Sequence, residues 1–378
     1  MGRVAIFLCW VPLVLSVKTL QLPQTDPNVF RTETTLVRLD VSVVDANGGA
    51  IPDLIPSEFE VRQDGKQRPV LFAEFRRPPA PELTPHTTTT QSGTAGRRIV
   101  VVVDDLWMSV ESVGRVREEL LAALLAHVTP QDQVMVVGTR AGTRAVAFTT
   151  DRTTLEGQVA ALRWEAPTRS VELDVNERRR RCMDVPGSES VLDVEFGDGS
   201  LAFIASAVSD LRSYPGRKII LLLADGIRSS CPEDRGKFEE RLRRLTDLAA
   251  RSASIIYALQ TRAFSSGVRM PDQRNRKSDV TGPPVIELIH NEISEYMKKL
   301  AEPTGGYADR GNSVSGLVAP ALNDASSYYV VAYEPPAGTF TSGNARYRRV
   351  QVRVSRRGAT VRTRAGFYSI PDSELVPR

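Results

Sequence analysis

Acidic residues follow two long aliphatic runs of the sequence, where a parallel β-sheet would expose them. Asp104 and Asp105 come directly after one run, and Asp225 comes directly after another. Ligands of open α/β sheets bind at the carboxyl ends of the strands, because the loops that leave those ends converge there. We therefore expect a ligand site at this edge. Three loops would form it: residues 104–109, 198–201 and 225–231.

The chain offers few groups for covalent or acid–base catalysis. Its three histidines are His86, His127 and His290. The first lies in a Pro- and Thr-rich segment and the second at the end of a predicted helix, so a Ser-His-Asp arrangement is not expected. The sequence has no G-x-S-x-G, no phosphate-binding G-x-x-x-x-G-K and no H-E-x-x-H. Adjacent aspartates do not face each other across a cleft, and a zinc site does not fit these ligand types. The sequence therefore predicts a protein that is not an enzyme.

Composition and charge are ordinary for a globular protein. Charged residues make up 25% of the chain and hydrophobic residues 41%, and the net charge of +4 is spread over both signs. No nucleic-acid partner is expected from such a balance. With 378 residues, the chain has room for two or three domains of about 150 residues. It can bury a full core without a disulfide framework.

Residues 1–17 have the pattern of an export signal. Arg3 supplies a positive start, and the apolar run Val4–Leu15 follows it. This run is too short to span a bilayer comfortably. Cys9 lies inside the run, so we do not predict a lipid attachment there. No later segment approaches about 18 consecutive apolar residues, and we expect a secreted or periplasmic protein without a transmembrane segment in its mature chain.

Removal of residues 1–17 leaves two cysteines, Cys182 and Cys231. Disulfides form and persist in the oxidising compartments outside the cytoplasm, so export predicts a bond between these two residues. Sequence spacing leaves the alternative open. The two thiols would stay free if the fold held them too far apart.

Aliphatic runs alternate with segments of helical periodicity between residues 97 and 312. The predicted strands are Ile99–Val103, Val134–Val137, Ala145–Phe148, Lys218–Ala224 and Ser254–Leu259. The predicted helices are residues 113–124, 155–162, 201–211, 236–252 and 286–300. This alternation is typical of βαβ units, which predict a mostly parallel sheet with helices on both faces.

Period-two alternation near both ends of the chain predicts a second, β domain. The strands expected there are Thr35–Val43, Phe59–Val61, Val70–Phe75, Tyr328–Tyr333, Val350–Val354 and Thr360–Arg364. A hairpin signal stands at Asp64-Gly65. Residues 78–96 are rich in Pro and Thr and are predicted as an extended linker. We expect the early segment, 30–77, to pair with the late segment, 325–372, so that the α/β domain at 97–312 is an insertion between them.

Several stretches resemble successive pieces of a von Willebrand factor A domain. They are IVVVVDDLWMS, DQVMVVGTRAGTRAVAFTTDRTTLEGQVAAL, KIILLLADG and LAEPTGGYAD. The flanks LVRLDVSVVDANGGAIPDLIPSEFEVRQDGKQRPVLFAEF and SYYVVAYEPP resemble those of VWFA-related proteins of the acidobacterial type. The resemblance lies in the combination and covers nearly all of the chain after the export signal. It implies an α/β doubly wound sheet with helices on both faces, flanked by a small β domain from the N- and C-terminal segments.

The resemblance also implies a divalent-metal adhesion site, with an Asp-x-Ser-x-Ser loop as its first part. Asp105 and Ser109 match the first and last positions of that motif, but Trp107 stands in place of the middle serine. If Asp104 takes the first position instead, neither serine is present. This part of the motif is therefore degenerate.

The other two parts of the implied site are a Thr on a second loop and an Asp on a third. Ser200 matches the second position with a hydroxyl, and Asp225 matches the third. Hard oxygen ligands of this kind suit Mg²⁺ or Ca²⁺, and a partner's carboxylate would complete the shell. The alternative is that the acidic residues cap helices and loops at the sheet edge, which is common for Asp.

Two groups of arginines are candidate binding features. Residues 165–198 replace a loop that is short in the resembling domains, and they carry a basic cluster that could contact an acidic partner: Arg178, Arg179, Arg180 and Arg181. A solvated loop partly neutralised by neighbouring acids is the alternative. The tail, residues 346–364, holds a further eight arginines. We expect these to protect sheet edges from strand addition, with binding to an anionic polymer or membrane surface as the alternative.

These features together predict an exported binding or adhesion-type protein. It would recognise a protein partner at the strand-end rim of the A-like domain. If the site holds a metal ion, we expect the partner to supply a carboxylate. The alternative function is a structural envelope scaffold whose metal site is not functional. A disulfide between Cys182 and Cys231 would bring the 165–198 insertion close to this rim beside Asp225.

Overall fold

The computed structural model describes nine stretches of the chain: residues 36–77, 96–105, 108–139, 146–164, 200–214, 216–227, 235–261, 294–341 and 346–369. Several predicted features lie outside these stretches: the export signal, nearly all of the linker, the 165–198 insertion with its four arginines, Cys182 and Cys231, and residues 286–293. The predictions made for them stay predictions.

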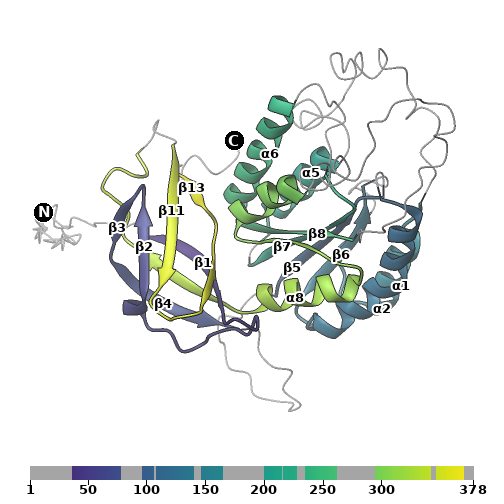
Figure 1. Cartoon of the computed structure of the whole chain (residues 1–378), viewed down its shortest axis with the longest axis horizontal. Helices are drawn as coiled ribbons and strands as arrows, with labels where there is room; N and C mark the ends of the chain where they lie inside the picture. Colours follow the sequence, from purple (N-terminus) through teal and green to yellow (C-terminus); the bar gives the residue numbers. More distant parts are fainter. Residues whose placement is uncertain are drawn as a thin grey trace, which may run out of the picture. The chain divides into compact units, whose positions relative to one another are not determined.

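A five-stranded parallel sheet forms the centre of the α/β domain (Figure 1). In spatial order its strands are β6 (Gln133–Gly138), β5 (Arg98–Val103), β7 (Lys218–Ala224), β8 (Ser254–Gln260) and β9 (Ala308–Arg310). Every neighbouring pair is parallel. All seven residues of β7 and of β8 are buried. Continuous aliphatic runs form strands of this kind because both faces of the sheet are covered.

Helices cover both faces of this sheet. On one face lie α1 (Val110–His127), α2 (Arg152–Ala161) and α8 (Val314–Ser326), packed against Ile99, Val101 and Val103. On the other face lie α5 (Ser200–Leu211), α6 (Arg235–Arg251) and the helical residues 294–301, packed against Val100 and Val102. Alternate residues of β5 thus enter two separate cores. The predicted doubly wound α/β fold is confirmed.

The two ends of the chain form a β-sandwich. One antiparallel sheet has the order β12 (Thr360–Arg362), β1 (Val37–Val44), β10 (Tyr328–Tyr333), β4 (Val70–Arg76); the other has β13 (Gly366–Tyr368), β11 (Tyr347–Val354), β2 (Phe59–Gln63), β3 (Lys66–Arg68). Early and late strands alternate, since β1 pairs with β10 and β2 with β11. Both sheets contribute to one apolar core. The predicted β domain of N- and C-terminal segments is confirmed.

The hairpin turn at Asp64-Gly65 was expected to lead into the strand Val70–Phe75, but a different strand follows it. Asp64 and Gly65 both have positive φ angles, 51° and 80°, which a two-residue type I′ hairpin turn requires. The strand that follows and pairs with β2 is the short β3, whereas β4 joins the other sheet. The residues Asp64-Gly65 correctly predicted the turn. The strand β3 was missed because its three polar residues show no hydrophobic alternation.

Other elements also differ from the predictions, and the short strands β9 and β13 were not predicted at all. The described residues 146–148 of the expected Ala145–Phe148 strand are not in a strand, and Thr149 makes only an isolated antiparallel bridge to Val134. Helix α8 was not predicted, because Gly316 and Pro320 lower its helix propensity. It forms because Ser313 caps its start and because its apolar side chains are buried against the sheet and α1.

A 3-10 turn, η1 (Pro56–Glu58), precedes β2, and another, η5 (Glu302–Thr304), precedes β9. Within the described part of the chain, no helix has the length and apolar character needed to cross a membrane.

Candidate functional site

Polar side chains from four loops meet at the carboxyl end of the parallel sheet. Asp104 and Asp105 follow β5, Thr139 follows β6, and Asp225 follows β7. Ser200 is the first residue of α5, and its hydroxyl lies close enough to Asp104 to lower the pKa of that carboxyl by hydrogen bonding. All five side chains are buried, which is unusual for so many polar groups together. The fold therefore places the predicted residues at the edge where parallel sheets bind ligands.

The Thr139 hydroxyl lies between the two adjacent aspartates. Its Oγ1 is 3.1 Å from Oδ1 of Asp104 and 3.0 Å from Oδ1 of Asp105. Gly138 makes room for this arrangement, because a Cβ atom at that position would stand 2.3 Å from Oδ2 of Asp105. The end of β6 is thus shaped around the Asp105 carboxylate.

Asp104 is the most electrostatically perturbed group of the site. Burial raises its pKa from an ordinary 3.8 to about 7, and the charges of Asp105 and Asp225 act in the same direction. The Ser200 and Thr139 hydroxyls oppose this shift only in part. Oδ2 of Asp104 is buried and has no hydrogen-bond partner among the described residues. A buried oxygen of this kind is costly unless something binds it.

Asp225 is held differently, because both of its carboxylate oxygens accept hydrogen bonds. Oδ2 accepts the backbone N–H of Ser109 at 2.8 Å, and Oδ1 accepts the hydroxyl of Thr261 at 3.0 Å. Its backbone oxygen also accepts the Gln260 side-chain amide at 3.0 Å. Asp225 therefore fastens the loop after β7 to the start of α1 and the end of β8.

Ser109 likewise stabilises local structure. It is the N-cap of α1, where its Oγ accepts the backbone N–H of Ser112 at 3.2 Å and lies 3.0 Å from the Ser112 hydroxyl. Arg115 lies next to it, with Nη2 donating to the Ser112 hydroxyl and to the Thr261 carbonyl. A cationic side chain thus stands at the rim on the Asp225 side.

The five predicted metal ligands therefore separate into two groups. Asp104 and Asp105 share the Thr139 hydroxyl, and the Ser200 hydroxyl acts on Asp104, whereas Ser109 and Asp225 are engaged in capping and loop contacts. Among the described residues, no three His, Cys, Asp or Glu side chains are grouped so that they could hold a metal by themselves. The oxygens present fit a Mg²⁺- or Ca²⁺-type ion only as a partial shell of carboxylates and hydroxyls, which water or a partner would complete.

Thr139 and Thr261 were not predicted as site residues. Each is the first residue after a buried parallel strand, and each places a hydroxyl on an acidic side chain. The same position rule that identified Asp104 and Asp225 would have found both. Trp107 and the arginines at 178–181 lie outside the described residues, as do both predicted disulfide cysteines.

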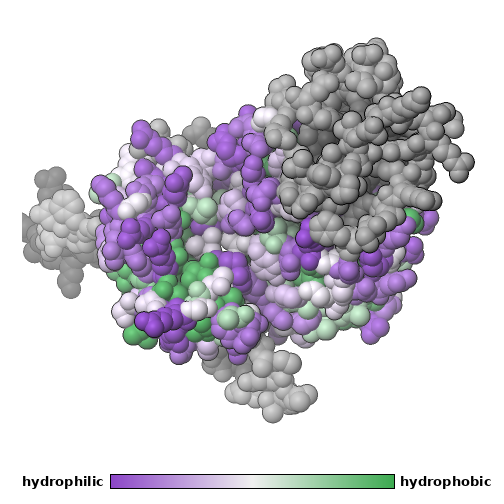
Figure 2. Space-filling model, viewed as in Figure 1, coloured by the Kyte–Doolittle hydropathy of each residue, from purple (hydrophilic) through white to green (hydrophobic). Residues whose placement is uncertain are grey.

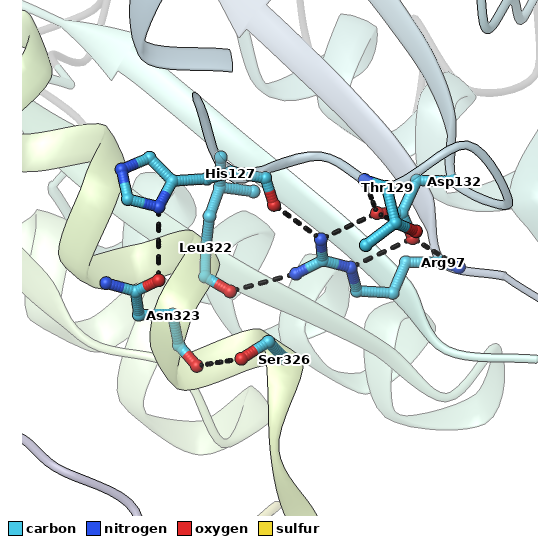
Figure 3. Close-up of polar contacts among 7 residues, drawn as sticks. All are labelled: Arg97, His127, Thr129, Asp132, Leu322, Asn323 and Ser326. Carbon is cyan, nitrogen blue, oxygen red and sulfur yellow. Dashed lines mark hydrogen bonds and ion pairs between the residues drawn. The ribbon is translucent and has the colours of Figure 1, made fainter. Parts of the chain in front are cut away.

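The opposite end of the sheet holds a buried ion pair instead (Figure 3). Arg97, just before β5, makes a salt bridge of 2.6 Å with Asp132, just before β6, and each side chain is at most 5% exposed. Arg97 also donates to the carbonyls of His127 and Leu322, while Thr129 donates to Asp132. Both charged side chains of the ion pair are fully engaged in these contacts, so this end of the sheet joins α1, α8 and two strands.

In comparisons with known proteins, no family model and no curated protein matches this chain. Among solved structures it is similar to the crystal structure of the human COPII-coat protein Sec24c, at 7% sequence identity and a TM-score of 0.31. The match covers 72% of this chain and 43% of the Sec24c chain, so the chain spans less than half of that protein's length. Similarity at this level supports no conclusion about the function of this chain.

Proposed function

We propose that this protein binds a divalent cation at the carboxyl end of its parallel sheet and recognises a carboxylate-bearing protein partner there. The export pattern of residues 1–17 supports a place outside the cytoplasm, either periplasmic or secreted. The resemblance of its segments to a von Willebrand factor A domain supports a binding role rather than a catalytic one. The protein would thus be of the adhesion type.

One observation carries the proposal: the buried Oδ2 of Asp104, which has no hydrogen-bond partner among the described residues. The charges that act on Asp104 are those of Asp105 and Asp225, and both disfavour its ionised form. A cation at this position would satisfy the free oxygen and neutralise the repulsion together. Loop contacts account for the burial of Asp225, but they do not account for the Asp104 oxygen that has no partner among the described residues.

Asp104 and Asp105 would hold the ion, with the hydroxyls of Ser200 and Thr139 as neutral oxygen donors. Asp225 and Ser109 would keep the loops in place around it through the bonds described above. A bound Mg²⁺ or Ca²⁺ would supply the positive charge that attracts a partner's carboxylate. Arg115, at the rim, would add a second positive group on the Asp225 side.

The experiment is calorimetric titration of the purified protein with Mg²⁺, Ca²⁺ and Mn²⁺, repeated on Asp104→Asn. Asp210→Asn is the matched control, because Asp210 is an exposed residue of α5. We expect saturable binding in the parent and the control, a melting temperature that rises with the ion, and neither in Asp104→Asn. No binding up to millimolar ion in the parent would overturn the proposal.

The hydrogen bonds of Asp225 favour a second candidate, a structural envelope scaffold whose site holds no ion. Both of its oxygens are occupied by loop-fastening contacts. This candidate predicts that the melting temperature of the parent does not respond to divalent ions, while Asp225→Ala melts at a lower temperature. The same titration therefore separates the two functions.

A further inference from the structure

The outer face of the sheet β13-β11-β2-β3, which is the face turned away from the sandwich core, has a regular set of polar groups. Along β11 the exposed residues Tyr347, Arg349, Gln351 and Arg353 alternate with Arg348 and with three valines that pack into the core. Exposed Gln67 of β3 and half-buried Arg62 of β2 lie beside them. We call these six residues the arginine–tyrosine face. Figure 2 shows hydrophilic residues over the upper part of β2, β3 and β11 and a hydrophobic patch below them.

The register of the strands sets these residues in rows. Gln351 is opposite Arg62, and Arg62 is opposite Gln67, so three side chains form one row across β11, β2 and β3. Neighbouring strands are about 4.8 Å apart, and alternate residues along a strand about 7 Å apart. The face is therefore a flat, closely spaced array of hydrogen-bonding groups.

Tyr347 is held rigidly at one end of this array. Its ring lies over Gly366, where a Cβ atom would stand 2.6 Å from the ring carbon Cζ. It also makes an edge-to-face contact with Tyr368, at 5.3 Å between ring centroids. Tyr368 donates to Asp247 at 2.7 Å, and Arg251 stacks on its ring. Even so, 40% of Tyr347 stays exposed, so the ring has a free and preorganised surface.

The charge of the face is net positive. Glu60 of β2 borders the face opposite Arg353, and its carboxylate makes an ion pair of 2.6 Å with Arg62. The guanidinium groups of Arg349 and Arg353 make no hydrogen bond or ion pair with any described residue, and both side chains are exposed. Two cations on one strand, without a partner in the described part of the chain, are available to an anionic ligand.

We propose that the arginine–tyrosine face binds a carboxylated polysaccharide. Guanidinium groups take carboxylates in a planar, two-bond geometry. The amides of Gln351 and Gln67 both donate and accept, which is what sugar hydroxyls require. A single exposed ring suits stacking on one sugar, whereas single-stranded nucleic acids stack successive bases on several aromatic side chains. Protein interfaces have an aromatic and apolar centre, which these described residues do not provide.

The test measures binding of polygalacturonate to the full chain by calorimetry, with neutral dextran and a single-stranded oligonucleotide as comparison probes. The variants are Arg349→Ser/Arg353→Ser and Tyr347→Ala. The control is Arg117→Ser/Arg357→Ser, which removes the same charge from exposed positions on α1 and on the turn after β11. Circular dichroism melts establish that each variant is folded.

We expect saturable binding of polygalacturonate and none of dextran. Affinity should fall by about tenfold or more in the Arg349/Arg353 variant, because two charge-assisted contacts are lost. It should fall severalfold in Tyr347→Ala and stay unchanged in the control. Equal losses in the control would show unspecific charge attraction and overturn the proposal. Tighter binding of the oligonucleotide through the same residues would overturn it in favour of a nucleic-acid surface.

Discussion

At the amino end of the parallel sheet Asp132 is buried against Arg97, whereas at the carboxyl end Asp104 is buried beside two other carboxylates. Burial alone raises the pKa of both groups. At Asp132 the hydrogen bonds and charge of Arg97 outweigh burial, so its pKa lies below the ordinary value. At Asp104 the Ser200 and Thr139 hydroxyls offset burial only in part, and its pKa rises to about 7. Burial alone therefore does not determine the direction of a carboxylate's pKa shift. The hydrogen-bond and charge partners of the carboxylate determine it.

The largest effect is expected from breaking the amino-end pair. Arg97→Met leaves Asp132 ionised and buried without its cation, and it frees the carbonyls of His127 and Leu322. The free energy of unfolding should fall by about 3 to 5 kcal/mol, measured by urea denaturation. Arg97→Met/Asp132→Asn should recover part of this loss, because no unpaired charge stays buried. A double variant as unstable as the single one would show that packing, not charge, sets the cost.

The carboxyl end should respond in the opposite sense. Asp104→Asn removes a charge that the fold disfavours, so it should raise the free energy of unfolding at pH 8 without divalent ions. The gain should be up to about 4 kcal/mol, since a tenfold change in proton affinity corresponds to about 1.4 kcal/mol. Urea denaturation of parent and variant measures it. A loss of stability instead would mean that Asp104 already has an unseen compensating partner.

The pH profiles sharpen this contrast. Because the folded pKa of Asp104 is raised, its protonated form is favoured in the fold, and parent stability should decline as pH rises from about 4 through 7. Asp132 has the reverse sign, so its contribution is present above about pH 4 and is lost as pH falls through its lowered pKa. Asp104→Asn should remove the first slope alone. An unchanged slope in that variant would assign it to another group.

A smaller effect is expected where Gly138 meets Asp105. Gly138→Ala places a Cβ atom 2.3 Å from the Asp105 carboxylate and should cost about 1 to 3 kcal/mol. Thermal melts would measure it. Gly157→Ala is the matched control, because the space around that helical glycine is open, and it should stabilise the protein by about 0.5 to 1 kcal/mol. Equal effects at both glycines would contradict a shaped pocket for Asp105.

The smallest effect is expected at the edge of the amino-end network. His127 contacts Asn323 at 3.1 Å through its ring in an exposed position (Figure 3), while its contact with Arg97 uses the backbone carbonyl. His127→Ala keeps that carbonyl, so the free energy of unfolding should change by less than about 0.5 kcal/mol. A loss comparable to that of Arg97→Met would show that the ring itself supports the network.

Much of this architecture could be predicted from the sequence. Continuous aliphatic runs predicted the buried parallel strands, since only a sheet covered on both faces accepts them. Period-two alternation predicted β1 and the second part of β11, and the run Tyr328–Tyr333 predicted β10 with its observed bounds. Helix α8 escaped prediction, because its stability comes from burial against α1 and the sheet rather than from the propensities of Gly316 and Pro320.

The sequence by itself determined which strands end in acidic residues, and so where a site could form. Only the tertiary structure decided what those residues do. Asp104 and Asp225 look alike in sequence, each following a buried strand, yet the fold gives Asp225 two donors and leaves one oxygen of Asp104 with none among the described residues. Partners of a side chain come from loops distant in sequence, so the environment of a carboxylate depends on contacts that local patterns do not encode.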